Sequence, residues 1–211
     1  MGKSKDKLAV ESNKLKYKDL ERLFDTQIQT LRNLSCPEQI VRLFVAKKSS
    51  VLSKASKMAF ENGHIPFIPV IPQRYRTLYD LIAMVRNGNE WGYTQLDPAD
   101  ITDKVKTPGR PYYIYDVEDG RAFLGKSPMD AEKILKKQLR SPLTTVEAIA
   151  LTIHTDVLRH HYIKAAGSCY NKSDDGIPAI FLHGGMPVLG WGLVDTRDER
   201  WGSPFCGSRD L

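Results

Sequence analysis

The stretch from Arg140 to Thr144, which reads Arg-Ser-Pro-Leu-Thr, contains residues that could bind an anion. Arg140 comes just before the expected start of a helix, where free N–H groups and the positive end of the dipole attract phosphates and carboxylates. A guanidinium adds two parallel donors to such a site. Arg140 is therefore a candidate clamp for a small anion. The alternative is a structural ion pair with an internal carboxylate, for which Asp116 and Glu147 are the candidates.

The acidic run Asp116, Glu118 and Asp119 could bind a cation or act in acid–base catalysis. In an enzyme, Asp116 or Glu147 would exchange protons with a substrate held by Arg140. The run is followed directly by Gly120, and Asp and Gly are typical turn residues. The same pattern therefore also indicates a simple turn.

Trp191 lies between two glycines in an expected strand, an arrangement that could form the floor of a cleft where the indole stacks on a ring. Core packing of Trp191 is the alternative. Ser168 and Cys169 are further candidates for a catalytic site. Cys169 is either a nucleophile that a histidine from elsewhere in the chain activates, or an ordinary buried thiol. Arg140, Asp116, Ser168 and Trp191 together would define a substrate cleft.

Known catalytic motifs are absent from the chain. It has no glycine-rich phosphate loop, no dinucleotide-binding fingerprint, no zinc-protease motif and no nucleophile elbow. His160 and His161 could join a cysteine at a zinc ion, but metal ligands normally occur in closely spaced pairs, and no such pair is present. We predict no metal and no cofactor.

Excess positive charge is concentrated in the first quarter of the chain. The net charge is +6, and residues 1–57 contain 13 Lys or Arg against 6 Asp or Glu. A basic surface attracts the phosphates of nucleic acids and other anions. Acidic residues are interleaved, so an ordinary solvated helix face is the alternative. The candidate anion-binding lysines are Lys14, Lys16, Lys18, Lys47 and Lys48.

The apolar spacing predicts two helices over residues 14–62. Apolar residues recur at intervals of three and four over 20–34 and again over 40–59. Ser35 is a candidate cap for the second helix, and Gly63 ends it. A sharp joint between two such helices favours an antiparallel pair.

Residues 63–211 mix helical and extended patterns. Residues 65–72 contain three prolines, which lack N–H donors, so this strand must lie at an edge or have one free side. Further predicted elements are strands over 90–96, 112–117, 177–182 and 187–194, helices over 77–85, 127–138 and 144–154, and a loop over 97–110. The predicted fold is α+β, with a helical pair packed on a mixed, largely antiparallel sheet. We expect a disordered basic tail over 1–13 and one domain over 14–211.

Composition and length fit an ordinary globular protein of 211 residues, with 41% hydrophobic and 27% charged residues. No apolar run approaches the length of a membrane helix, and the first residues do not read as a secretory signal. Three scattered cysteines do not form a disulfide framework. We therefore expect a cytoplasmic protein with reduced thiols and no membrane association.

Several runs resemble domain-of-unknown-function family 5701, an uncharacterised prokaryotic family. The most specific match is residues 140–151, supported by residues 112–120, residues 124–131, the pair Gly190-Trp191, and residues 206–209, which end at Arg209. The resemblance covers residues 20–211 and implies one domain. It implies no reaction, but it adds Arg209 to the candidate ligand-binding residues. The segment after Trp191 is more charged here than is usual for the family and lacks its histidine.

Two functions of different classes follow. The first is a non-catalytic binding or accessory protein whose anionic partner, a nucleic acid or a phosphate-bearing ligand, meets the basic helices or Arg140. The second is an enzyme for a small anionic substrate in a cleft near Arg140, Asp116 and Trp191, with Glu147 and Ser168 nearby. The enzyme requires these side chains to converge on an open concavity.

Overall fold

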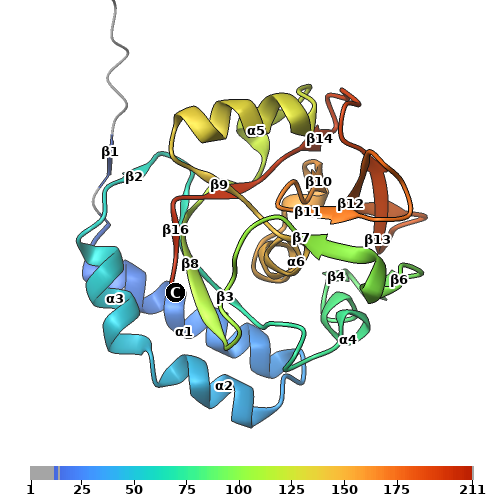
Figure 1. Ribbon diagram of the computed structural model, residues 1–211. Coiled ribbons are helices and arrows are strands. Elements are labelled where there is room, and N and C mark those ends of the chain that lie inside the picture. Colours follow the sequence, from blue (N-terminus) through green and yellow to red (C-terminus); the bar gives the residue numbers. More distant parts are fainter. Residues whose placement is uncertain (1–11, 14, 211) are drawn as a thin grey trace, which may run out of the picture.

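The computed structural model describes residues 12, 13 and 15–210 of the chain, and these residues form an α+β fold (Figure 1). The α-helices are α1 (Tyr17–Asn33), α2 (Glu38–Val45), α3 (Lys48–Ser56), α4 (Leu78–Ile82), α5 (Pro128–Lys137) and α6 (Thr145–His154). The 3₁₀ turns are η1 (Pro98–Asp100), η2 (Arg121–Phe123) and η3 (Val157–Arg159).

Two sheets form the body of the protein. The first has the order β16-β8-β3, all antiparallel, from β3 (Ile65–Val70), β8 (Tyr112–Val117) and β16 (Ser208–Arg209). The second has the order β14-β10-β12-β13-β6, from β6 (Tyr93–Thr94), β10 (Tyr162–Lys164), β12 (Gly176–His183), β13 (Met186–Leu193) and β14 (Trp201–Gly202). In the second sheet β14 and β6 pair in parallel with their neighbours, so the fold is mixed but largely antiparallel, as predicted.

Four short pairs complete the strands. They are β1 (Ser12–Asn13) with β2 (Phe60–Glu61), β4 (Arg86–Asn87) with β5 (Glu90–Trp91), β7 (Ile101–Asp103) with β11 (Ser168–Tyr170), and β9 (Ser141–Pro142) with β15 (Phe205–Cys206). Ser12 and Asn13 belong to the tail that the sequence predicts to be disordered. They instead pair with Glu61 and Phe60, and the rest of the predicted tail lies outside the described residues.

Strand β8 is buried on both faces because helices cover the sheet on each side. Successive strand residues point to opposite faces. Tyr113 stacks on Phe24 of α1 and meets Phe44 of α2 edge-on, at centroid distances of 5.9 and 5.5 Å. Its neighbour Tyr112 points the other way, to Glu147 of α6. The first sheet therefore lies between the N-terminal helices and α6.

Helix α6 lies at the centre of the molecule, where Figure 1 shows it end-on between the two sheets. Its first eight residues, 145–152, are all buried. A helix surrounded by protein must be largely apolar and uncharged on all sides, and the sequence Thr-Val-Glu-Ala-Ile-Ala-Leu-Thr meets this condition with one charged exception. The exception is Glu147, whose carboxylate must find partners in the interior.

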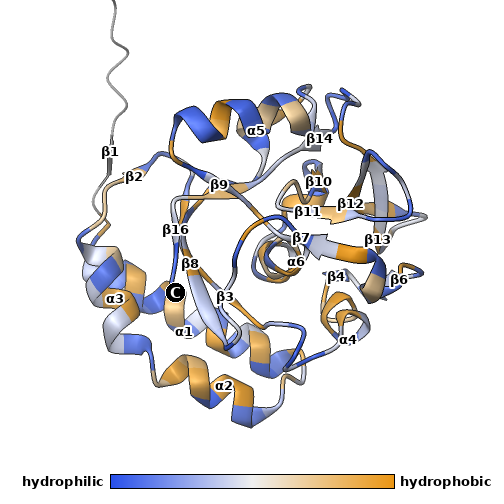
Figure 2. Cartoon of the chain, viewed as in Figure 1, coloured by the Kyte–Doolittle hydropathy of each residue, from blue (hydrophilic) through white to orange (hydrophobic). Residues whose placement is uncertain are grey.

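The N-terminal helices number three, because the expected second helix is divided. The chain turns at Ala46 and Lys47, between α2 and α3. This bend lets Phe44 and Val51, on either side of it, both be fully buried. Helix α1 agrees with its predicted stripe, and polar and apolar residues recur along it in Figure 2.

Ser35 does not cap α2 as predicted. It has a positive φ of 55° at the end of α1, and Pro37 takes the cap position of α2 without a side-chain bond. By contrast, Thr77, Ser127 and Thr144 cap α4, α5 and α6 as predicted, each accepting from a backbone N–H three residues on.

The proline-rich strand β3 lies at the edge of its sheet, as predicted; two of the three prolines, Pro66 and Pro69, fall within it and lack N–H donors. The expected loop over 97–110 contains η1 and the strand β7, which sequence analysis missed. One connected cluster of buried apolar side chains extends from Leu20 in α1 to Cys206 in β15. None of the described helices is both long enough and apolar enough to cross a membrane.

Candidate functional site

Glu147 is the buried anchor of the region around the start of α6. Its Oε2 accepts a hydrogen bond from the Thr144 N–H at 2.9 Å, which completes the predicted capping box. Arg209 of β16 donates from Nε to Oε1 at 2.6 Å and from Nη2 to Oε2 at 2.7 Å. The Tyr112 hydroxyl donates to Oε1 at 2.9 Å. Glu147 has no exposed surface, so all these bonds form away from solvent.

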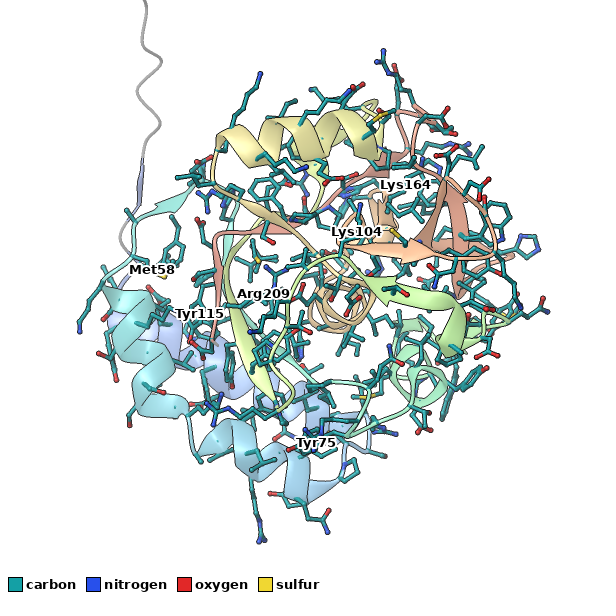
Figure 3. The ribbon with its side chains drawn as sticks, in the orientation of Figure 1. Met58, Tyr75, Lys104, Tyr115, Lys164 and Arg209 are labelled. Atoms are coloured by element: carbon teal, nitrogen blue, oxygen red, sulfur yellow. The ribbon has the colours of Figure 1, made fainter. Side chains whose placement is uncertain are left out.

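Arg209 is equally well satisfied. It donates to Ser141 Oγ at 2.7 Å and to the Pro142 carbonyl at 3.0 Å, and Figure 3 shows it near the centre of the molecule. Burial alone would lower the pKa of Arg209, but the hydrogen bonds and charge of Glu147 outweigh burial and raise it. Burial and the same carboxylate raise the pKa of Tyr112. This ion pair joins α6, β8, β9 and β16 and leaves no group free to react.

Ser168 connects the start of α6 to Asp103. Its Oγ accepts from the Thr145 N–H at 2.8 Å and donates to Asp103 Oδ1 at 2.6 Å. Ser168 is almost fully buried, whereas Asp103 belongs to the exposed strand β7. Partial burial of its carboxyl group raises the pKa of Asp103, and the Glu147 charge adds to this rise, while the Ser168 bond opposes it.

An open crevice of about 240 Å³ lies over these residues, and we call it the α6 crevice. Arg74, Asp103, Thr107, Tyr112 and Thr144 contribute polar groups to its lining. Two buried sequence-predicted residues, Glu147 and Ser168, thus hold lining residues of this crevice in place without entering it.

The α6 crevice has one arginine in its lining, Arg74, and a second, Arg110, directly follows its lining residue Gly109. Arg74 lies against the loop over 104–110, with its Nη1 only 3.3 Å from where a Cβ at Gly109 would be. Burial lowers the pKa of Lys47. The negative charge of Asp210 opposes this shift, and the positive charge of Arg110 adds to it. Within the described residues, no carboxylate lies within 4 Å of the charged atoms of Arg74, Arg110 or Lys47.

Arg140 has an internal partner, which was the alternative to an anion clamp. Its Nη1 bonds to Asp116 Oδ2, and its Nη2 lies 3.6 Å from Glu61 Oε1. His64 Nδ1 bonds to the other Asp116 oxygen at 2.7 Å. We call Glu61, His64, Asp116 and Arg140 the Asp116 cluster. Burial tends to raise the pKa of Asp116, but His64 and Arg140 outweigh burial and lower it.

The Asp116 cluster is separate from the α6 crevice, because none of its four residues lines that crevice. Arg140 is also not at a helix start: its N–H bonds to Leu135 O at the end of α5, and β9 separates it from α6. The acidic run has turn chemistry as well. The Glu118 carboxylate accepts from the N–H groups of Gly120 and Ala122, both at 2.8 Å.

Trp191 lies in neither place. It is 47% exposed on β13 and stacks on Tyr170 at a centroid distance of 5.5 Å. The preceding Gly190 makes room for the Phe181 ring, which would lie 3.0 Å from an added Cβ. The structure therefore does not bring Trp191 together with Arg140, Asp116 and Ser168 at one concavity.

The candidate lysines differ in their surroundings. Lys48 is paired with Glu21 and Asp25, at 3.3 and 2.8 Å. Lys16 and Lys18 are exposed at the start of α1, and Lys14 lies outside the described residues. Lys47 lies near Asp210 and Arg110, and it is not among the residues that line the α6 crevice. Across the part of the chain that the structure describes, no three His, Cys, Asp or Glu side chains gather as metal ligands.

The comparisons with known proteins give one match. The family described as "Family of unknown function (DUF5701)" matches residues 22–210, which is most of the chain. The chain belongs to this family. No curated protein and no solved structure matches significantly. Membership agrees with the resemblance of the Arg140 run and brings no reaction or ligand with it.

Sequence reasoning missed Arg74, Asp103 and Arg110. A signal was present for part of this set, because residues 104–110 read Lys-Val-Lys-Thr-Pro-Gly-Arg, three cations around a turn. Nothing in the spacing indicated Arg74, which reaches this loop only through the fold.

Proposed function

We propose that this protein is a non-catalytic binding protein that holds a phosphate-bearing ligand at the α6 crevice. One observation carries the proposal: Arg74 lines the crevice beside Gly109, Arg110 directly follows that glycine, and neither arginine has a carboxylate within 4 Å in the described residues. Crowded like charges destabilise one another, and a bound anion relieves that repulsion.

Arginine is well suited to a phosphate. Its planar guanidinium donates two parallel hydrogen bonds to a pair of oxygens, and such charge-assisted bonds are roughly twice as strong as neutral ones. The helix start itself contributes less here. Two of its donors, the N–H groups of Thr144 and Thr145, are already bonded to Glu147 and Ser168. The arginines, rather than the α6 dipole, would therefore supply most of the binding energy.

The polar side chains of the site favour binding over catalysis. The acid–base candidates Glu147 and Asp116 are engaged in ion pairs, and Ser168 is buried. Asp103 is the acid that lines the crevice, and its carboxylate is already bonded to the Ser168 hydroxyl at 2.6 Å.

A small ligand fits the site better than a nucleic acid. The crevice of about 240 Å³ has room for one or two phosphate groups, and its lining contains no exposed aromatic side chain on which bases could stack. A nucleic acid would instead contact Lys16 and Lys18, which are exposed at the start of α1.

The test is calorimetric titration of the purified chain with inorganic pyrophosphate at low and high salt. We expect saturable binding that R110A and R74A each weaken about tenfold, consistent with loss of one charge-assisted contact. The matched control is R42A, which removes an exposed arginine of α2 that lies 3.9 Å from Glu38.

Two results would contradict the proposal. One is pyrophosphate binding that R110A and R74A leave unchanged. The other is absorbance at 260 nm that co-purifies with the protein, leaves at high salt and depends on Lys16 and Lys18. That second result would assign the partner as a nucleic acid bound by the basic helices.

A further inference from the structure

The lining of the α6 crevice contains polar side chains that keep free hydrogen-bonding groups. They are Gln73, Arg74, Asp103 and Thr107. Among the described residues, the side chains of Gln73 and Thr107 form no hydrogen bond, and no carboxylate lies within 4 Å of the Arg74 guanidinium. The Gln73 amide, the Arg74 guanidinium and the Thr107 hydroxyl can all donate to a ligand. These groups therefore suit the oxygen atoms of a phosphate.

Asp103 is the exception in this lining, because an ionised carboxylate can only accept hydrogen bonds. It belongs to β7 and is exposed. Its Oδ1 accepts from the Ser168 hydroxyl at 2.6 Å, and Ser168 is itself held by the Thr145 N–H at 2.8 Å. The carboxylate is thus fixed in position. Within the described residues no other hydrogen bond and no ion pair reaches it, so its second oxygen still needs a donor.

A bare phosphate or pyrophosphate uses only part of this lining. It brings acceptor oxygens and negative charge, which the Asp103 carboxylate repels. A ligand that also carries a donor would replace this repulsion by a charge-assisted hydrogen bond. A hydroxyl group fits this role better than an ammonium group, because Arg74 lines the same crevice and Arg110 follows its lining residue Gly109. The two arginines would repel a second cation.

We propose that the ligand of the α6 crevice is a phosphorylated polyol. Its phosphate group would bind Gln73, Arg74 and Thr107, and one of its hydroxyl groups would donate to Asp103. This inference rests on the proposed function, because it names the ligand class of the same site. The size of the crevice agrees with it. A volume of about 240 Å³ equals that of roughly eight water molecules, which is enough for a ligand of about ten non-hydrogen atoms.

The experiment compares two phosphate esters that differ only in their hydroxyl groups. Glycerol 3-phosphate and propyl phosphate have the same carbon chain, and both are largely dianions at pH 8 because the second phosphate pKa is about 6. Each is titrated calorimetrically into the full chain. We expect glycerol 3-phosphate to bind about tenfold more tightly than propyl phosphate, which is the effect of one hydrogen bond to a charged group.

The variant D103N tests the residue that the proposal assigns to the hydroxyl group. Asparagine keeps an acceptor for the Ser168 hydroxyl but removes the negative charge. D103N should therefore bind propyl phosphate more tightly than the wild-type chain does, and its preference for glycerol 3-phosphate should fall below about threefold. The matched control is D195N, which removes an exposed aspartate outside the crevice lining and should change neither affinity.

Equal affinity of the wild-type chain for the two esters would overturn the proposal, and this comparison does not depend on the folding of any variant. A preference for glycerol 3-phosphate that D103N leaves intact would also overturn it. The variant R74A separates this failure from that of the proposed function. If both esters bind equally and R74A weakens both, the phosphate site stands and the polyol assignment is wrong. If neither ester nor pyrophosphate binds, the proposed function fails as well.

Discussion

Replacing Arg209 by Met should destabilise the fold strongly, because it breaks the buried ion pair with Glu147. The side chain of Arg209 is 6% exposed and that of Glu147 is 0% exposed. Without Arg209, the Glu147 carboxylate keeps bonds from Tyr112 and Thr144 but loses its only countercharge among the described residues. Removing one partner of a buried pair costs about 3–5 kcal/mol.

The expected change in melting temperature follows from the size of the chain. For 150–250 residues, each kcal/mol shifts Tm by roughly 2–4 °C, so R209M should lower Tm by roughly 6–20 °C. The matched control is R200M. Arg200 forms an ion pair with Asp198 on the surface, with a side chain 73% exposed, and such pairs contribute about 0–1 kcal/mol.

The assay is urea unfolding followed by circular dichroism and by tryptophan fluorescence, with coincident transitions required before a free energy is derived. The double variant E147Q/R209M should recover about 1–3 kcal/mol relative to the sum of the single changes, because the uncompensated charge is then absent. A cost below about 1 kcal/mol for R209M, or one equal to that of R200M, would refute the assignment of this pair as a structural anchor.

Three further predictions concern protons and packing. Because the pKa of Asp103 is raised, sulfate affinity at the α6 crevice should increase as pH falls from 7 toward about 4, and D103N should abolish that increase in a calorimetric titration. The pKa of Asp116 is lowered in the folded state, so the ionised carboxylate stabilises the fold. This stabilisation is complete above the unfolded pKa of about 3.9 and is lost as the pH falls through the folded pKa. R140M should therefore flatten the fall in Tm measured between pH 5 and pH 2. Gly202→Ala should cost about 1–3 kcal/mol in urea unfolding, because its Cβ would lie 2.3 Å from the Gly120 carbonyl oxygen, whereas G192A, with 3.7 Å of clearance, should cost much less.

Local signals predicted the helix starts well. Thr77, Ser127 and Thr144 were assigned as caps because each is followed three residues later by an acidic residue, and a cap bond joins residues only three positions apart. Ser35 fits the same pattern, yet it ends α1 in a left-handed conformation. There the turn between α1 and α2 decided the backbone, and the cap pattern could not show it.

The candidate site was less predictable, because its contacts join residues far apart in the sequence. The Arg140 run left two outcomes open, an anion clamp or the more common ion pair with Asp116 or Glu147. The fold pairs Arg140 with Asp116, and it gives Glu147 to Arg209, 62 positions away. Strand β7 was missed because Ile101 is its only apolar residue, and it forms a strand by pairing with β11.

The sequence by itself determined the α+β class, the caps of α4, α5 and α6, the edge position of β3 and the family. These features depend on the pattern of neighbouring residues: prolines without N–H groups cannot occupy a central strand, and an apolar run flanked by a capping box forms a buried helix. Only the tertiary structure decided which charges are used internally and which remain for a ligand. Arg209, Arg140 and Arg74 are the same residue type in the sequence. Closure of the chain buries the first against Glu147, pairs the second with Asp116, and leaves the third at an open crevice beside Gly109.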